Sequence, residues 1–177
     1  MPGPRLRPSG MTTPTSTRTP KALLLDDDTT VLRLLGTALQ ERGFDVRAAT
    51  DGEAGTAVLL DELLGLDVLV VDADLPGRDA RALLHLVRWA GGERELGVVV
   101  LASGPDAAAR DELLALGADA VVDRRAGHAV ALEAIGATVR RVRSPAHRLA
   151  RAAGPALRGA LALAGALAPA RLARAGA

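Results

Sequence analysis

The 177-residue sequence contains no cysteine, which excludes disulfide bonds, thiol catalysis and cysteine-ligated metal centres. Aromatic side chains are almost as rare. Only Phe44 and Trp89 are present, so the chain cannot form an aromatic platform for stacking nucleic-acid bases. Lysine occurs once, at Lys21, among 22 basic residues, and any chemistry that requires a lysine depends on that residue.

Long apolar runs are also missing. The longest apolar-biased stretch, 156–168, is interrupted by one arginine and two glycines, whereas a membrane-spanning helix needs about 20 apolar residues. The first 20 residues are rich in Pro, Thr, Ser and Gly and contain no hydrophobic region typical of a signal peptide. These features predict a cytoplasmic protein and leave open whether translation begins at Met1 or Met11.

Acidic residues are absent from both ends of the chain. Residues 1–20 carry a net charge of +3 and residues 144–177 carry +5, whereas residues 21–143 hold 14 basic and 21 acidic groups, a net of −7. The formal total of +1 is therefore a cancellation between an acidic middle and two basic ends. This distribution argues against a compact core that binds nucleic acid.

Composition divides the chain into three parts. We expect a disordered extension over 1–20, one domain over 21–143, and a basic Ala/Leu/Arg-rich tail over 144–177 that is partly helical or disordered. If the tail forms a helix, its first arginines gather on one side and its leucines spread over the other. Such a pattern allows a weak contact with an anionic membrane surface.

Short apolar runs alternate with segments of helical periodicity throughout the middle part. Four of the runs are continuous, as expected for strands buried on both faces of a parallel sheet, and cover 22–25, 68–71, 98–101 and 120–122. The run 44–48 alternates between apolar and polar residues and predicts an edge strand. Helical segments fill the gaps, over 29–42, 51–64, 79–90, 105–116 and 128–143. The pattern predicts an α/β fold of the (βα)5 type, a doubly wound parallel sheet in the flavodoxin-like order 2-1-3-4-5.

Acidic side chains follow the first and third predicted strands. Asp26 and Asp27 come directly after the first strand, and Asp72 after the third. These strands are neighbours in the predicted order, about 4.8 Å apart, so the three carboxylates converge at one edge of the sheet. Carboxylates this close repel one another unless a hard cation neutralises them, and a small oxygen set suits Mg²⁺. Helix capping, which we expect of Asp28, does not explain acids on two adjacent strands.

The segments LLLDDDTTVLRLL, LQERGFDVRAATDGEAG, DVLVVDADLPGRDARALL and LGADAVVD resemble, in this order, the receiver domain of two-component response regulators. The resemblance covers about residues 21–143. It implies a single-domain response regulator in a phosphorelay, a phosphoprotein that signals through protein–protein contact and is not an enzyme in the usual sense. The implied partners are a sensor histidine kinase or phosphotransfer protein and a downstream protein, without direct contact with nucleic acid.

The resemblance also implies roles for individual residues. Asp72 would accept the phosphoryl group from a phosphohistidine of a sensor kinase. Asp27, Asp72 and the backbone carbonyl of Asp74 would bind Mg²⁺, and Asp26 would support the ion through water. Arg124 stands where the family has a lysine and would contact the phosphoryl group, with a planar guanidinium in place of an ammonium.

Three positions that carry the phosphorylation signal in the family depart from its pattern. Ala102 occupies the position of the usual hydroxyl, and the nearest hydroxyl belongs to Ser103, one residue on, where the side chain of a strand points the opposite way. Val121 occupies the position of the switch aromatic. These departures leave open a pseudo-receiver that acts as a docking module without phosphorylation.

A second resemblance points to another class of protein. The Asp-Ala-Asp of 72–74 is similar to the start of haloacid-dehalogenase-type phosphatases. That family has Thr or Val where Pro76 stands, and its lysine and second acid pair come later in the chain, whereas here they come earlier.

Trp89, near the end of the third predicted helix, is expected to pack against a helix edge.

Overall fold

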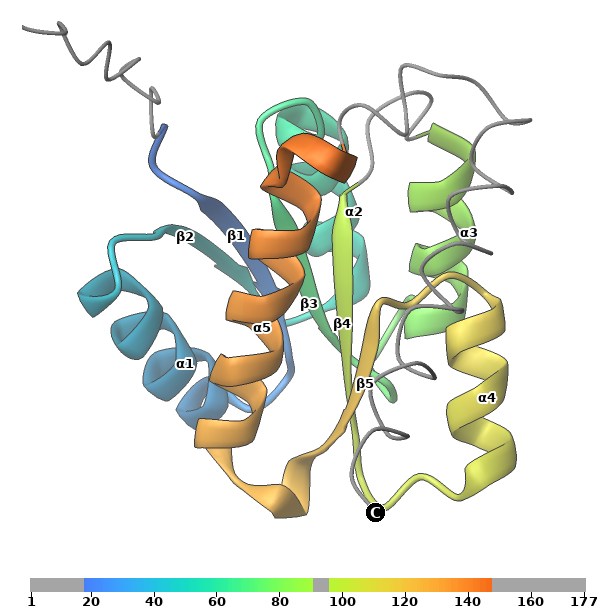
Figure 1. Ribbon diagram of the computed structural model, residues 1–177. Helices are drawn as coiled ribbons and strands as arrows, with labels where there is room; N and C mark the ends of the chain where they lie inside the picture. The colour runs from blue at the N-terminus through green and yellow to red at the C-terminus, as the bar shows by residue number, and fades with distance from the viewer. Residues whose placement is uncertain (1–17, 91–95, 148–177) are drawn as a thin grey trace, which may run out of the picture.

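The computed structural model describes residues 18–90 and 96–147 (Figure 1). The strands are β1 (Lys21–Leu25), β2 (Asp45–Ala49), β3 (Val68–Asp72), β4 (Gly97–Ala102) and β5 (Ala120–Asp123). The helices are α1 (Thr29–Glu41), α2 (Gly52–Glu62), α3 (Ala80–Ala90), α4 (Ala107–Ala115) and α5 (His128–Arg143), and a short 3-10 helix, η1, spans Arg124–Ala126.

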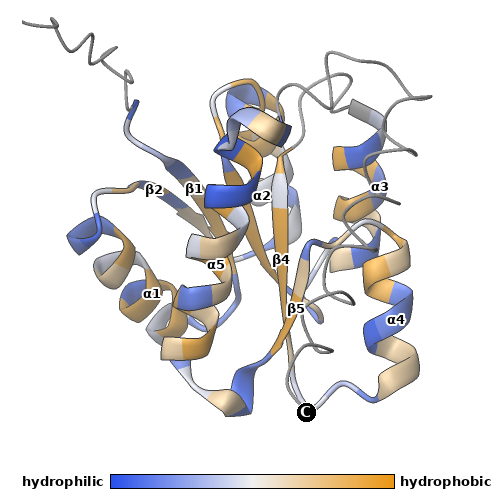
Figure 2. Ribbon diagram, viewed as in Figure 1, coloured by the Kyte–Doolittle hydropathy of each residue, from blue (hydrophilic) through white to orange (hydrophobic). Residues whose placement is uncertain are grey.

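The five strands form one parallel sheet in the order β2-β1-β3-β4-β5, which confirms the predicted fold class. Helices α1 and α5 cover one face, and α2, α3 and α4 cover the other (Figure 1). The edge position of β2 is confirmed, and no residue of this strand is fully buried. Every residue of β3 and β4 is buried, and Figure 2 shows β4 as a hydrophobic strand between the helices.

Aspartates define where several helices begin. Asp28 accepts hydrogen bonds from the backbone N–H groups of Thr30 at 2.8 Å and Val31 at 3.4 Å, which confirms its predicted capping role. Asp51 and Asp106 cap α2 and α4 in the same way. Helices α2, α3 and α4 start one or two residues later than the apolar pattern predicted, and for α2 and α4 the reason is that the capping aspartate itself is not helical, whereas α1 and α5 start at the predicted residue.

The buried face of α3 is filled by Leu83, Leu84 and Val87, none more than 1% exposed. Trp89 points away from this face and is 84% exposed. The expectation that Trp89 packs against a helix edge is therefore wrong, because the smaller aliphatic side chains already occupy the contact with the sheet.

A buried carboxylate lies directly before the start of β3. Asp67, with a side chain 6% exposed, accepts hydrogen bonds from Arg18 Nη2 at 2.8 and 2.9 Å and from the backbone N–H of Lys21 at 2.9 Å. Arg143, at the end of α5, lies 3.4 Å from the same carboxylate and donates to the backbone carbonyl of Arg18. Asp67 therefore joins the segment before β1 to the last turn of α5.

Most of the predicted terminal extensions, residues 1–17 and 148–177, lie outside the described residues. The helical or disordered character expected of the tail is therefore still a prediction. Among residues 18–90 and 96–147, no helix combines the length and the apolar character that crossing a membrane requires.

Replacement of Asp67 tests this junction. We expect Asp67→Asn to lower the free energy of unfolding by about 2 kcal/mol, because charged donors then face a neutral, partly mismatched amide. Urea unfolding followed by circular dichroism measures this loss. The matched control is Glu133→Gln, whose ion pair with Arg140 joins side chains 76% and 68% exposed. Exposed pairs contribute little, so equal effects of the two substitutions would contradict the structural role of Asp67.

Candidate functional site

Three carboxylates meet at the carboxyl ends of β1 and β3. Leu25 of β1 pairs with Val71 of β3, and this register brings Asp26 and Asp27, which follow β1, beside Asp72 at the end of β3. One oxygen from each of the three aspartates lies within 4.8 Å of the others. Asp26 and Asp72 are buried, at 2% and 4% exposure, whereas Asp27 is exposed.

The buried position of Asp72 disfavours its charged form. Burial raises the pKa of Asp72 above the ordinary value, and the negative charges of Asp26, Asp27 and Asp74 raise it further. The positive charge of Arg124 acts in the opposite direction without cancelling the effect. The carboxylate of Asp72 therefore sits where a nearby cation strongly favours its ionised state.

Arg124 supplies one such cation. Its Nη1 donates to Asp72 Oδ1 at 2.8 Å, and its Nη2 lies 2.8 Å from both Oδ1 and Oδ2 of Asp26. The backbone N–H of Asp28 also donates to Asp26 Oδ1, at 2.9 Å. The guanidinium thus bridges the two buried acids, an arrangement that its planar fork of donors favours.

The position of Arg124 depends on η1, which the sequence pattern did not predict. Asp123 caps this short helix by accepting from the backbone N–H of Arg125 at 2.9 Å, and it also accepts from the backbone N–H of Gly104 at 3.1 Å. Gly127 ends η1 with a φ of 90°, a conformation that favours glycine. An Asp four residues before a Gly is a signal for such a capped turn, and it places Arg124 at the turn's first position.

The remaining predicted residues lie around this cluster. Ala102 is buried at the end of β4, where it pairs with Asp123, and Val121 is buried in β5. Ser103 is exposed, and within the described residues its hydroxyl makes no hydrogen bond with the three carboxylates. Asp74 is exposed and its carboxylate is not part of the close group of three.

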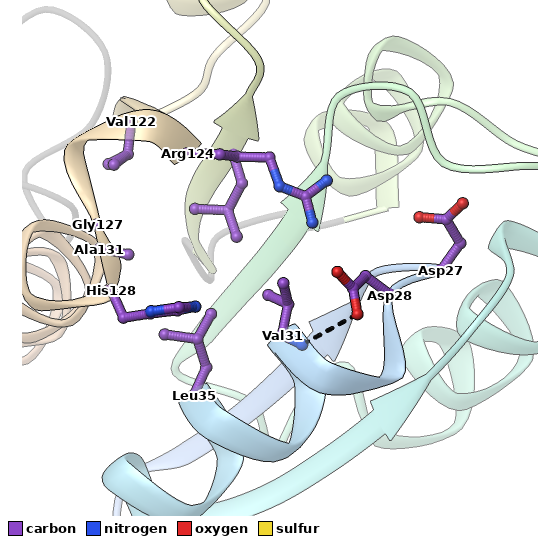
Figure 3. Close-up of a pocket in the computed structure, with 10 residues that line it drawn as sticks. Asp27, Asp28, Val31, Leu35, Val122, Arg124, Gly127, His128 and Ala131 are labelled. Carbon is purple, nitrogen blue, oxygen red and sulfur yellow. Dashed lines mark hydrogen bonds between the residues drawn. The ribbon is translucent and has the colours of Figure 1, made fainter.

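A pocket of about 340 Å³ adjoins the carboxylates, between α1 and α5. Its apolar lining consists of Val31, Leu35, Leu101, Val122 and Ala131. Asp27, Asp28, Arg124 and His128 supply its polar lining. Figure 3 shows the Arg124 guanidinium on the side of the pocket toward Asp27 and Asp28, with His128 beside Leu35 on the opposite side. The sequence did not indicate this pocket, because its walls come from segments distant in the chain.

The donor atoms in the cluster fit a hard divalent cation. Within the described residues, neither the Asp27 carboxylate nor Asp72 Oδ2 has a hydrogen-bond partner, and both belong to the close group of three acids. Carboxylate oxygens with access to solvent are the ligands that Mg²⁺ prefers. The pKa of Asp72 is raised chiefly by burial, and the negative charges of the neighbouring aspartates add to this effect.

The capping role of Asp123 predicts a pH dependence of stability. Its hydrogen bonds from the Arg125 and Gly104 backbone N–H groups lower the pKa of Asp123. A carboxylate with a lowered folded-state pKa contributes stability above its ordinary pKa and loses it as the pH falls through the folded value. We therefore expect Asp123→Asn to be less stable than the wild type at pH 7, with a difference that shrinks below about pH 4.

Urea unfolding between pH 7 and about pH 2.5 measures this difference. The matched control for loss of one carboxylate is Asp61→Asn, on the exposed side of α2. A gap between Asp123→Asn and the wild type that stays constant over the whole range would contradict the capping contribution.

Known proteins resemble this chain in sequence and in fold. Residues 22–135 match the family model of the response regulator receiver domain. The chain is 33% identical over 86 residues to a two-component response regulator of Arabidopsis thaliana, an overlap of 49% of this chain and 15% of that protein. It is 31% identical over 109 residues to the sensor protein GacS of Pseudomonas syringae, covering 60% and 12%. It is 32% identical over 103 residues to the transcriptional regulatory protein AruR of Pseudomonas aeruginosa, covering 56% and 41%.

The chain therefore spans less than half the length of these relatives. Among solved structures, it superimposes on the receiver domain of the Francisella response regulator 1452 with a TM-score of 0.63 and 24% identity, covering 71% of this chain and all of that one. A receiver domain protein of Methanospirillum hungatei gives 0.63 and 21%, covering 71% and 97%. These structural likenesses support the fold. Because the family model matches more than half of the sequence, the chain belongs to the response regulator receiver domain family.

Proposed function

We propose that this chain is a phosphoryl-accepting receiver of a two-component phosphorelay, with Asp72 as the acceptor. The observation that carries the proposal is the setting of Asp72. Its carboxylate is buried at the end of β3, grouped with Asp26 and Asp27 within 4.8 Å, and bonded through one oxygen to Arg124 at 2.8 Å. A nucleophilic oxygen, acidic ligands and a guanidinium are therefore within reach of one phosphoryl group.

The residues of the cluster supply every protein group that the proposed reaction needs. Asp72 Oδ2 forms a new O–P bond with the phosphoryl group of a phosphohistidine while the N–P bond of the donor breaks. The imidazole nitrogen keeps the bonding electron pair and takes up a proton from solvent. Arg124 remains within reach of the transferred oxygens and stabilises their negative charge through its N–H donors.

Mg²⁺ is the cofactor that we propose for this reaction. Asp27, Asp72 and the backbone carbonyl of Asp74 would hold it, with Asp26 acting through water. When bound, the ion neutralises charge on the equatorial phosphoryl oxygens. Support comes from the close group of three carboxylates, and the pKa of Asp72, raised chiefly by burial, is raised further by the charges of its acidic neighbours.

The proposed partners follow from the same family. The phosphoryl donor would be a sensor histidine kinase or a phosphotransfer protein. The signal would pass to an unidentified downstream protein that binds the surface of the domain. Direct binding to nucleic acid is not part of the proposal, because residues 21–143 carry a net charge of −7. We place the protein in the cytoplasm, and we expect no catalytic turnover beyond gain and loss of its own phosphoryl group.

A pseudo-receiver is the second candidate, and the residues at three positions favour it. Ala102 lacks the hydroxyl that the family uses, Ser103 is exposed, and Val121 replaces the switch aromatic. A domain with these residues would present one docking surface whether or not Asp72 is phosphorylated. The haloacid-dehalogenase-type alternative draws no support from the family match, which names the receiver domain.

Phosphodonor labelling tests the acceptor role. We expect the wild type, incubated with Mg²⁺ and a small acyl phosphate, to gain one phosphoryl group by intact-mass spectrometry, and Asp72→Asn to gain none. The amide removes the nucleophilic carboxylate while keeping nearly the same shape.

Asp74→Asn is the matched control, since it removes an exposed carboxylate two residues away and leaves its backbone carbonyl in place. We expect this variant to be labelled like the wild type. An unlabelled wild type, under conditions that label an ordinary receiver, would overturn the acceptor proposal in favour of the pseudo-receiver. Equal labelling of the wild type and Asp72→Asn would place the acceptor elsewhere.

A further inference from the structure

We propose that Arg124 acts as an internal counter-ion that competes with Mg²⁺ for Asp26 and Asp72, and thereby sets the metal affinity of the site. The inference rests on the Mg²⁺ role in the proposed function but not on phosphoryl transfer. It assigns Arg124 a task in the resting protein, before any phosphoryl group is present.

The contacts of Asp26 are the first support. Both of its carboxylate oxygens lie 2.8 Å from Arg124 Nη2, and one of them also accepts from the backbone N–H of Asp28. The side chain of Asp26 is 3% exposed and that of Arg124 is 23% exposed. Water therefore has little access to this pair, and a cation that uses Asp26 has to replace a direct charged hydrogen bond.

The second support is the way in which the Arg124 guanidinium divides its N–H donors between Asp72 and Asp26. The guanidinium places one nitrogen on each acid, Nη1 on Asp72 and Nη2 on Asp26, and leaves Asp72 Oδ2 and Asp27 unbonded within the described residues. An incoming Mg²⁺ thus meets only part of the oxygen set, and it approaches a positive charge already bound there. Two like charges a few ångströms apart in a poorly solvated site repel strongly.

The charge balance is the third support. Three carboxylates and one guanidinium leave the cluster with two uncompensated negative charges, fewer than the acids alone would have. Arg124 therefore performs part of the neutralisation that a metal ion would otherwise supply. A guanidinium is not deprotonated in proteins, so Arg124 stays charged in this role.

A lysine at this position cannot reproduce the bridge. Its single nitrogen carries the same charge, but it cannot place two separate nitrogens on two acids, and its charge is compact rather than spread over a plane. Arg124→Lys therefore keeps the charge of the site while releasing oxygens of Asp26 or Asp72 to a metal. This substitution separates competition for oxygens from simple repulsion between charges.

The test is Mg²⁺ binding to the full chain by isothermal titration calorimetry. We expect Arg124→Lys to bind Mg²⁺ about tenfold more tightly than the wild type, the change that loss of one charged hydrogen bond corresponds to. The matched control is Arg125→Lys, the same substitution on the next, exposed residue of η1, which should bind like the wild type. Equal affinities of the wild type and Arg124→Lys, or no Mg²⁺ binding by Arg124→Lys, would overturn the inference.

Thermal unfolding gives a second readout that does not depend on phosphorylation. In a chelator, Arg124→Lys should melt below the wild type because the two buried acids lose their bridge. Added Mg²⁺ should raise the melting temperature of Arg124→Lys more than that of the wild type. In Arg124→Lys the metal supplies a counter-ion that the substitution removed, whereas in the wild type it has to displace Arg124. Equal increments would overturn the inference.

The labelling experiment separates this inference from the proposed function. Unlabelled wild-type protein together with a tenfold affinity gain in Arg124→Lys would remove the acceptor role and leave the competition standing. Labelled wild-type protein with no gain in the Mg²⁺ affinity of Arg124→Lys would keep the acceptor role and remove the competition.

Discussion

The placement of like charges at the carboxyl ends of β1 and β3 is the constraint around which this domain is arranged. Parallel pairing of the two strands brings Asp26 beside Asp72, and burial makes their repulsion stronger than it would be in water. Arg124 relieves part of that repulsion through three contacts of 2.8 Å. The position of Arg124 depends in turn on η1, on its cap Asp123, and on the hydrogen bond that ties this cap to the loop after β4.

Much of the fold could be predicted from hydrophobic pattern alone. The uninterrupted run of β3 and the alternating run of β2 report directly how many faces of each strand are covered, and both assignments were correct. The grouping of Asp26, Asp27 and Asp72 was also predictable, because strand order and strand ends follow from the same pattern. Local capping by Asp28 needed only the residue type and its place before the helix.

Other features depend on contacts between distant segments, which no local pattern reports. Asp67 resembles an ordinary residue before a strand, and only the folded chain brings Arg18 and Arg143 to it. The bridge that Arg124 forms between Asp26 and Asp72 depends on the length and planarity of its side chain and on segments far apart in the sequence. Trp89 was expected to pack, and its exposure follows from aliphatic neighbours on α3 that already fill the interface.

Asp67 and Asp72 mark opposite ends of one buried strand segment. The cluster at Asp67 gathers the residues just before β1 and the last turn of α5, so the chain enters and leaves the domain at one pole (Figure 1). The carboxylates and Arg124 occupy the other pole. The two ends of the described domain, at Arg18 and Arg143, therefore lie on the side away from its chemistry.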